Sequence, residues 1–277
     1  MAVDRKGETE LEGWSKRPRL PELEDLPYLP SWWRDWMTDC LEMIQRITQP
    51  YRNVEPLLRR LIERTAASAI VDFGSGAAGP AVEIFERLVK TFPDLTLTLT
   101  DKFPNQAAAR RVAHRARENN LDITYRSESV EMSKPPTGTI GVRTIFTAFH
   151  HLSPEDALRV LEAAVRDRQP LAIFEVTGRS PAHFVMNALI PFLVLGITPF
   201  LRPRSPGRFA ATYVLPFIPL GCLWDGIISN LRTYSVEDLY NLSRRLDAPD
   251  VEFEIGRFTA LGPLRGTYLL CSPRAPV

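Results

Sequence analysis

Apolar residues recur at three- and four-residue intervals along the chain from Trp32 to Ile47. This spacing places them on one side of an amphipathic helix, for which Ser31 is a suitable N-terminal cap. A second helix is predicted over residues 54–64. The tryptophans on the apolar side are better explained by packing than by ligand binding, because a helix needs such a side to dock on its protein. We therefore expect residues 31–66 to form an N-terminal helical cover.

Residues 1–30 mix charges of both signs with several prolines. Such a composition buries little apolar surface and interrupts regular helices. This part of the chain is expected to be a flexible arm, held at most near residues 26–29. The first residues are charged and lack the apolar stretch of a secretory signal, which indicates a cytoplasmic location.

After Ala67, short apolar runs typical of strands alternate with helical patterns. The alternation predicts a parallel sheet covered by helices on both faces, with the active cleft at the carboxyl ends of the strands. Two final strands, 251–258 and 266–271, are joined by a loop too short for a crossover helix, so we expect them to be antiparallel. We assign residues 67–277 to one α/β domain. The other expected elements are strands at 69–73, 95–100, 123–126, 144–148 and 171–176, and helices at 81–90, 106–119 and 155–166.

Charge and cysteine content narrow the function classes. The formal net charge of +1 leaves no excess of basic residues to neutralise a nucleic-acid backbone, so a nucleic-acid partner is not expected. Cys40, Cys222 and Cys271 are far apart and lack the spacing of a zinc site. We expect buried, reduced thiols and no metal site. The sequence does not indicate an oligomeric state.

A glycine-rich loop, Gly74-Ser75-Gly76-Ala77-Ala78-Gly79, separates the first predicted strand from the next helix. Glycines allow a sharp turn there and let a ligand approach the backbone, and Pro80 suits the first turn of the helix. The spacing alone fits a nucleotide site or a simple tight turn. Asp101 ends the following strand, where a carboxylate can accept both hydroxyl hydrogens of a ribose or can cap a helix.

Asp72, the residue at the end of the first strand, helps to separate two classes of cofactor. A carboxylate there would repel the pyrophosphate of a nicotinamide dinucleotide but would complement a cofactor that carries an ammonium and a sulfonium group. This favours S-adenosylmethionine. A structural Asp72 bonded to loop amides is the alternative. An NAD-dependent oxidoreductase, or a non-catalytic cofactor-binding protein associated with a membrane, stays open as an alternative function.

The run from Asp72 to Gly76, with the predicted sheet and the final antiparallel pair, resembles the class I S-adenosylmethionine-dependent methyltransferases. The resemblance covers residues 69–176 and the last two strands. It implies a Rossmann-like α/β fold whose seven-stranded, mostly parallel sheet has an antiparallel last strand. It also implies that the loop backbone holds the amino-acid end of the cofactor, and that the residues after Asp101 border the adenine. The cofactor-binding residues expected on this basis are Asp72, Gly74, Ser75, Gly76, Gly79, Asp101, Lys102, Phe103, Ser129, Val130 and Thr147. Ser129 and Val130 depart from the family pattern, because many members carry an aspartate there, for which Ser129 or Glu128 would substitute.

The segment from Thr144 to Leu152 contains two adjacent histidines, His150 and His151, where a strand runs into a loop. Ser153 then has the pattern of a helix N-cap. Both histidines are expected to face the cleft, and the resemblance places this edge beside the methyl group and its acceptor. An imidazole there can take a proton from a hydroxyl or amine, with His150 the slightly stronger candidate, or either ring can simply pack under the next helix.

Two charge-free runs, residues 184–200 and 209–223, form an insertion within residues 181–230. Each run is shorter than the ~20 residues that span a bilayer and each contains prolines, so two transmembrane helices are not expected. A lid whose apolar inner side meets the acceptor is the first interpretation. The second is peripheral membrane contact through residues 184–223, and the third is a core or dimer contact. In the membrane case Arg202, Arg204 and Arg208 would meet anionic headgroups. Independently of these interpretations, Asp225, Arg232 and Tyr234 further downstream would orient the acceptor or form a salt-bridged loop ahead of a helix.

Together these patterns predict a methyltransferase that moves a methyl group to an oxygen or nitrogen of a small, largely apolar acceptor.

Overall fold

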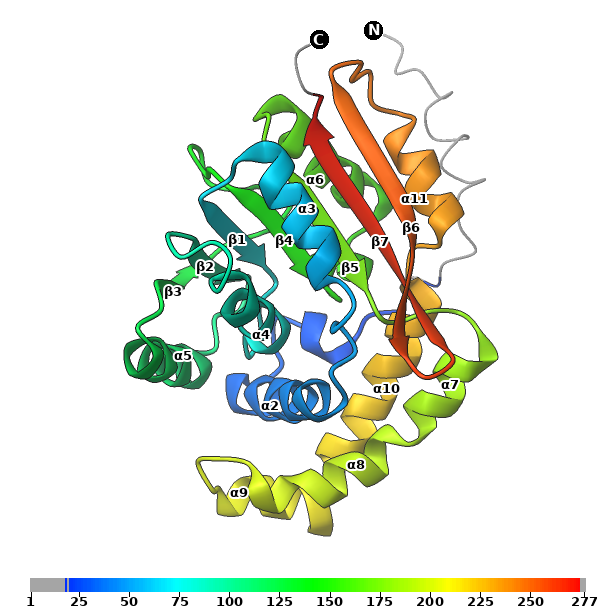
Figure 1. Ribbon diagram of the computed structural model, residues 1–277. Coiled ribbons are helices and arrows are strands. Elements are labelled where there is room, and N and C mark those ends of the chain that lie inside the picture. Colours follow the sequence, from blue (N-terminus) through cyan, green and yellow to red (C-terminus); the bar gives the residue numbers. More distant parts are fainter. Residues whose placement is uncertain (1–17, 19, 275–277) are drawn as a thin grey trace, which may run out of the picture.

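A single mixed sheet lies at the centre of the computed structural model, which describes residue 18 and residues 20–274 (Figure 1). Within this part of the chain the sheet has seven strands in the order β3-β2-β1-β4-β5-β7-β6. The strand β7 pairs antiparallel with β5 and with β6, whereas the other pairs are parallel. The predicted mostly parallel sheet with an antiparallel last strand is confirmed. The strands are β1 (Ala69–Phe73), β2 (Thr96–Asp101), β3 (Ile123–Ser129), β4 (Val142–Phe146), β5 (Leu171–Glu175), β6 (Val251–Leu261) and β7 (Leu264–Pro273).

Helices cover both faces of the sheet, as the βα alternation predicts. On one face α3 (Glu55–Thr65), α4 (Gly79–Leu88) and α5 (Gln106–Asn119) bury apolar side chains against the strands. On the other face α6 (Pro154–Arg166) and α11 (Val236–Ser243) do the same. Each set contributes to a separate apolar core, and burial of these cores is the main force that holds the layers together.

A third group of elements lies at the carboxyl end of β1, β4 and β5, below the sheet in Figure 1. It includes α2 and the helices of residues 181–230, called here the helical insertion. Met37 and Cys40 of α2 pack with Val194, Ile218 and Cys222 of the insertion. The apolar stripe of α2 is therefore core packing. The elements are η1 (Leu23–Asp25), α2 (Ser31–Thr48), η2 (Phe149–His151), α7 (Pro181–Ala188), α8 (Ile190–Ile197), η3 (Thr198–Phe200), α9 (Pro206–Phe209), η4 (a π-helical turn, Ala210–Val214) and α10 (Phe217–Arg232).

Two local expectations at the N-terminal side are wrong. Pro30, not Ser31, occupies the N-cap position of α2, and Ser31 is its first helical residue. Residues 20–30 are not a free arm, because they contain η1 and because Glu22 is buried against other parts of the chain. The remainder of the expected arm, residues 1–17 and 19, lies outside the described residues. The predicted cap Ser153 is confirmed, since its side chain accepts a hydrogen bond from the backbone amide of the third residue of α6. Ser235 caps α11 in the same way.

All three cysteines are free and buried, as predicted. Burial raises the pKa of Cys40 and of Cys271 to about 12. Both thiols therefore stay protonated at neutral pH and serve as small apolar side chains.

Candidate functional site

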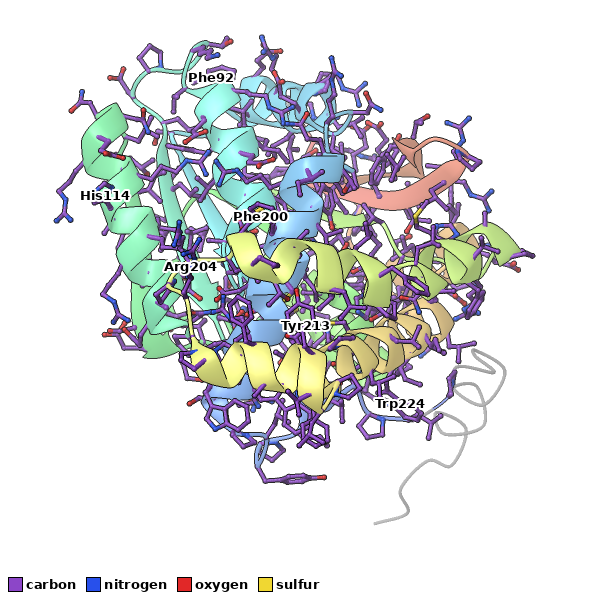
Figure 2. The ribbon with its side chains drawn as sticks, turned by 90° about the horizontal axis from the view of Figure 1, so that it is seen from below. Phe92, His114, Phe200, Arg204, Tyr213 and Trp224 are labelled. Carbon is purple, nitrogen blue, oxygen red and sulfur yellow. The ribbon has the colours of Figure 1, made fainter. Side chains whose placement is uncertain are left out.

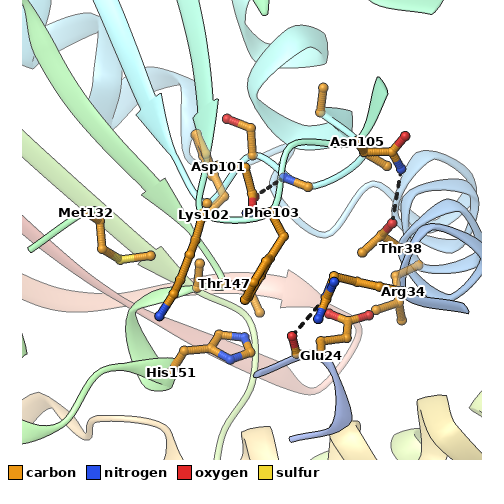
Figure 3. Close-up of a pocket in the computed structure, with 18 of the residues that line it drawn as sticks. Glu24, Arg34, Thr38, Asp101, Lys102, Phe103, Asn105, Met132, Thr147 and His151 are labelled. Atoms are coloured by element: carbon orange, nitrogen blue, oxygen red, sulfur yellow. Dashed lines mark hydrogen bonds between the residues drawn. The ribbon is translucent and has the colours of Figure 1, made fainter. Parts of the chain in front are cut away.

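A cavity of about 320 Å³ opens at the carboxyl ends of β1, β2 and β4 (Figure 3). Its lining comes from the loops that follow these strands and also from η1 and α2. This is the edge of an open α/β sheet where small molecules bind, and the volume lies within the range of ligand pockets. The structure therefore has a cavity at the edge of the sheet where the cleft was expected.

The glycine loop forms one wall of this cavity. Gly74, Ser75, Gly76 and Gly79 all line it, as expected. Gly74 has a φ of +71°, and a Cβ atom there would lie 2.8 Å from the Cβ of Ala148. Only glycine fits this position, because both the backbone conformation and the close contact exclude a side chain.

Asp101, at the end of the neighbouring strand β2, is hydrogen-bonded to the glycine loop. Its Oδ2 accepts a hydrogen bond from the Gly76 amide at 2.7 Å, and its Oδ1 accepts one from the Phe103 amide at 2.7 Å. Burial raises the pKa of Asp101, while these two amides act to lower it. A carboxylate oxygen can accept more than one hydrogen bond. Asp101 can therefore fix the loop and still receive hydroxyl groups of a ligand in the cavity.

Lys102 and Phe103 line the cavity next to Asp101. The guanidinium group of Arg34 lies 4.0 Å from the centre of the Phe103 ring, which is a cation–π contact. Arg34 also donates to the backbone oxygens of Glu24 and Leu26, so it holds η1 and α2 together beside the ring (Figure 3).

Asp72 does not line the cavity, although direct contact with a cofactor was expected. Its side chain is buried beneath the loop, where Oδ2 accepts from the Ser75 hydroxyl at 2.6 Å and Oδ1 from the Thr144 hydroxyl at 2.7 Å. Burial raises its pKa to about 7, despite the two hydroxyl donors. Asp72 therefore supports the loop from below. The alternative of bonds to loop amides is also not what the structure shows, since the donors are hydroxyl groups.

The acidic residue that the family pattern suggests near Ser129 and Val130 lies further along the chain. Ser129 lies outside the lining, because its hydroxyl donates to the backbone oxygen of Lys102 at 2.7 Å, whereas Val130 lines the cavity as expected. The acidic group at this strand end is Glu131, which lines the cavity and lies 3.4 Å from the Lys102 Nζ. The glutamate stands two residues after the position that the family pattern suggested.

Thr147 lines the cavity at the turn after β4 and has a φ of +44°. A β-branched residue rarely adopts this conformation, and such residues gather at functional sites. Its hydroxyl holds the turn, because it accepts from the Val176 amide at 3.1 Å and bonds the Tyr51 hydroxyl.

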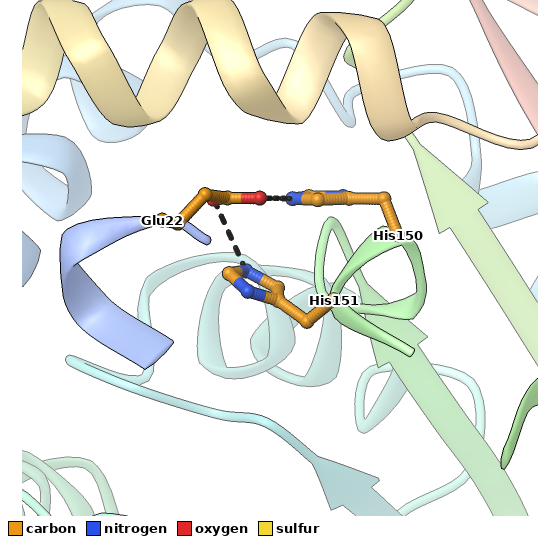
Figure 4. Close-up of side chains that lie close together, drawn as sticks. All are labelled: Glu22, His150 and His151. Carbon is orange, nitrogen blue, oxygen red and sulfur yellow. Dashed lines mark ion pairs between the residues drawn. The ribbon is translucent and has the colours of Figure 1, made fainter. Parts of the chain in front are cut away.

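The two histidines take different places. His151 lines the cavity, and its Nδ1 lies 2.8 Å from Asp25 Oδ1. His150 is not part of the lining but is fully buried, with its Nδ1 2.7 Å from Glu175 Oε2. The expectation that both face the cavity is therefore wrong for His150. Their Nε2 atoms each lie 3.6 Å from an oxygen of Glu22 (Figure 4).

The carboxylates around the histidines raise the pKa values of both imidazoles. Burial lowers the pKa of His150, but Glu175 and Glu22 outweigh it and raise that pKa to about 10. The pKa of His151 is also raised, since Glu22 and Asp25 outweigh burial. Burial would raise the pKa of Glu22, yet His151 and His150 bring it down to about 2. His150 and Glu22 therefore form an ion pair at neutral pH, and the carboxylates around His151 favour its charged form.

Of the downstream residues considered for acceptor binding, Asp225 and Arg232 hold η1 in place, and Tyr234 braces the loop after η2. Arg232 Nη1 lies 2.6 Å from Asp25 Oδ2 and 3.3 Å from Glu22 Oε1. Asp225 accepts from the Leu23 amide at 2.6 Å, and the Tyr234 hydroxyl donates to the Leu152 oxygen. None of Asp225, Arg232 and Tyr234 lines the cavity.

Among the described residues, Glu22, His150 and His151 form a group that could hold a metal ion, since one ligand atom from each lies within 4.8 Å of the others. The Glu22 carboxylate is already paired there with Arg232 and with the His150 imidazole, whose pKa is raised to about 10. We assign no metal to this group.

Sequence reasoning missed the polar side of α2. Arg34, Thr38, Glu42 and Gln45 line the cavity, and they recur at the same three- and four-residue spacing as the tryptophans on the other side. The helical spacing of these polar residues was therefore visible in the sequence, but only the apolar side of the helix was interpreted. No residue of the helical insertion is among the lining residues, so the predicted lid over the cleft is wrong: α2 and η1 cover the cavity, and the insertion packs on α2.

Comparisons with known proteins identify the fold. No protein-family model and no curated protein sequence matches this chain. The plantazolicin methyltransferase BpumL in complex with SAH is 12% identical, with a TM-score of 0.52 over 88% of this chain and 96% of that one. A SAM-dependent methyltransferase from Aquifex aeolicus is 16% identical, with a TM-score of 0.43 over 79% of this chain and 89% of that one. The similarity to BpumL shows that this chain has the class I methyltransferase fold. The similarity to the Aquifex aeolicus protein is too weak to support a further conclusion.

Proposed function

We propose that this chain, whose fold is that of the class I methyltransferases, is an S-adenosylmethionine-dependent methyltransferase that methylates an oxygen or nitrogen of a small, largely apolar acceptor. The observation that carries the proposal is the meeting of the glycine loop and Asp101 at the wall of one cavity. The loop offers backbone at close approach, and Asp101 offers a carboxylate for the hydroxyl groups of a ribose.

The charge of the cavity favours a cationic cofactor. Its lining has more acidic than basic side chains, with Arg34, Lys102 and His151 as the basic ones. Such a lining complements the ammonium and sulfonium groups of S-adenosylmethionine and opposes the pyrophosphate of NAD. Asp72 does not contribute to this complementarity, because it does not line the cavity. The acidic residues counted here are Asp25, Asp35, Glu42, Asp101, Glu131 and Asp156. Glu24 also lines the cavity, but burial raises its pKa to about 8, so it adds little charge at neutral pH.

The acceptor side of the cavity has apolar walls. Leu41, Met132, Phe146 and Leu152 contribute apolar side chains to the lining, and Leu152 directly follows His151 in the chain. These side chains suit an apolar molecule and exclude water around the reacting atoms. Bound S-adenosylmethionine supplies a methyl group on a positively charged sulfur, so a bond from the acceptor to carbon forms as the carbon–sulfur bond breaks. The chain itself then has to position the acceptor, and the proton that the acceptor loses passes to water.

His151 is the residue placed to contact the acceptor. Its pKa is raised and the Asp25 carboxylate lies on Nδ1, and both favour a role as hydrogen-bond donor over a role as base. A donor at this place favours the deprotonated form of an acceptor oxygen, which is the better nucleophile. His150, held by Glu175 and Glu22, is a positioning residue for the turn.

Titration calorimetry with S-adenosylhomocysteine and with NADH tests the cofactor. We expect binding of the former, weakened about tenfold or more in Asp101→Asn, because the hydroxyls lose a charged acceptor. Asp94→Asn is the matched control, since Asp94 is exposed near the opposite end of β2. Tight NADH binding without binding of S-adenosylhomocysteine would overturn the proposal. Mass-shift assays with apolar phenols, acids and amines then identify the acceptor.

A further inference from the structure

The outer side of the helical insertion exposes an unusual number of large apolar side chains. Phe192 is 69% exposed, Phe200 73% and Val214 75%. Contiguous apolar surface of this kind on a folded domain marks an interaction site. We call it the exposed apolar face, and it consists of Val185, Leu189, Phe192, Leu193 and Phe200 from α7 to η3, with Tyr213, Val214, Leu215, Phe217, Leu220 and Trp224 from η4 and α10.

Figure 2 views the molecule from this side. The helices of the insertion cross the front of the view, with Phe200 and Tyr213 on them, Arg204 at one end and Trp224 toward the other. The opposite sides of the same helices are buried, as Val194, Ile197 and Ile218 pack toward α2. The helices therefore lie flat on the domain with one apolar side inward and another outward.

The chain composition of this region fits a lipid surface. Within the described residues, one helix, Pro181–Phe200, is long and apolar enough to cross a membrane, yet only 28% of its most apolar window is buried. A second candidate, Pro206–Val214 with Phe217–Arg232, is bent by 70°. Because α8 contacts both α2 and α10, the first helix is attached to the domain along its side. It can lie in the plane of an interface more easily than it can span the bilayer.

The charged residues of this region indicate that the lipid surface is anionic. From Val176 to Trp224 the sequence contains no aspartate or glutamate but four arginines. Arg202 and Arg204 are exposed between the two apolar runs. Arg208, expected at the same tip, is buried and lies 3.0 Å from Asp39, so it is not available for headgroups. Two exposed arginines among apolar side chains complement anionic headgroups.

The aromatic residues support the same orientation. Tyr213 and Trp224 are about half exposed, and the Tyr213 hydroxyl donates to the Leu195 oxygen while the Trp224 Nε1 donates to the Pro21 oxygen. Side chains with an apolar body and a polar tip are favoured at the boundary between lipid tails and water.

We propose that the exposed apolar face docks peripherally on an anionic lipid bilayer, with Phe192, Phe200 and Val214 inserted among the lipids and with Arg202 and Arg204 at the headgroups. The docking does not depend on the proposed methyl transfer. It leaves the cavity on the other side of α2, within the part of the domain that stays in water.

Vesicle flotation with the full chain tests the docking. We expect the protein to float with vesicles of phosphatidylcholine and phosphatidylglycerol and to bind pure phosphatidylcholine more weakly. The pair Phe192→Ser and Phe200→Ser should reduce binding at least about tenfold, because two phenyl rings no longer leave water. Arg202→Gln and Arg204→Gln should each reduce it about fivefold at low salt. Ile140→Ser is the matched control, since Ile140 is 73% exposed on a loop outside the exposed apolar face.

Circular dichroism and the elution volume of each variant show whether it is folded and monomeric. Absence of flotation by the native chain would overturn the proposal, and so would flotation that the phenylalanine pair leaves unchanged. A native dimer that dissociates in the phenylalanine variant, without vesicle binding, would show that a second copy covers the face.

Discussion

Arg208 Nη2 lies 3.0 Å from Asp39 Oδ2, and both side chains are buried. Arg111 of α5 pairs with the other oxygen of Asp39 at 2.6 Å. A single carboxylate on α2 thus joins the helical insertion to the body of the α/β domain.

Removal of this carboxylate is expected to destabilise the protein. Asp39→Ala should lower the free energy of unfolding by roughly 3–5 kcal/mol, because it leaves the Arg208 charge buried without its partner. Urea denaturation measures the change, and Asp94→Ala at an exposed site is the control. A loss below about 1 kcal/mol would mean that the pair does not hold the insertion.

Gly74→Ala should abolish tight cofactor binding, because the new Cβ would lie 2.8 Å from Ala148 Cβ and 3.2 Å from Met132 Cε. Gly138→Ala is the matched control, since Gly138 has a φ of +79° but no atom lies within 4 Å of the place that a Cβ would take there. Both variants carry the backbone strain of about 1–2 kcal/mol. Calorimetry with S-adenosylhomocysteine should therefore separate them, and equal affinities would refute a role for the close contact.

Asp72 predicts a pH dependence of stability. Its pKa is raised from 3.8 to about 7 in the folded protein. Folding therefore favours the protonated form, and this contribution is present below about pH 3.8 and is lost as the pH rises through 7. Asp72→Asn keeps a neutral side chain at all pH values, so the decline attributable to this residue, on the order of 4 kcal/mol, should disappear. Urea titrations of both proteins from pH 4 to 8 measure it; parallel curves would be the contrary result.

His151→Ala should lower methyl transfer about a hundredfold and leave affinity for S-adenosylhomocysteine unchanged, because a donor to the acceptor is lost but the cofactor contacts remain. His114→Ala, at an exposed position on α5, is the control. His150→Ala should instead lower the stability of the fold, since Glu175 and Glu22 lose their buried partner. Unchanged turnover in His151→Ala would remove it from the mechanism.

The sheet could be predicted from the sequence because its signals are local. Short apolar strands, glycine at the first turn and serine caps each act within a few residues, and their order along the chain defines the topology. The same locality made Gly74, Gly76 and Asp101 predictable, since they lie at the ends of adjacent strands and meet wherever those strands pair.

The rest of the site depends on contacts between distant segments. Glu22 is bonded by Ser229 and Arg232, more than two hundred residues later, and no local pattern reports such a partner. The choice between His150 and His151 depends on which ring Glu175 captures. The position of the helical insertion could not be predicted for a similar reason. The sequence of an apolar run is the same whether the run covers a cavity, packs on α2 or faces outward.

The acidic lining of the cavity bears on the order of events in a catalytic cycle. Under the proposed function, methyl transfer would convert the positively charged sulfur of the cofactor into a neutral thioether, so the reaction would remove one charge from a cavity whose lining is mostly acidic. The lining would then attract fresh cofactor more strongly than the spent one, and the difference would grow as ionic strength falls. We therefore expect inhibition by S-adenosylhomocysteine to weaken in dilute salt.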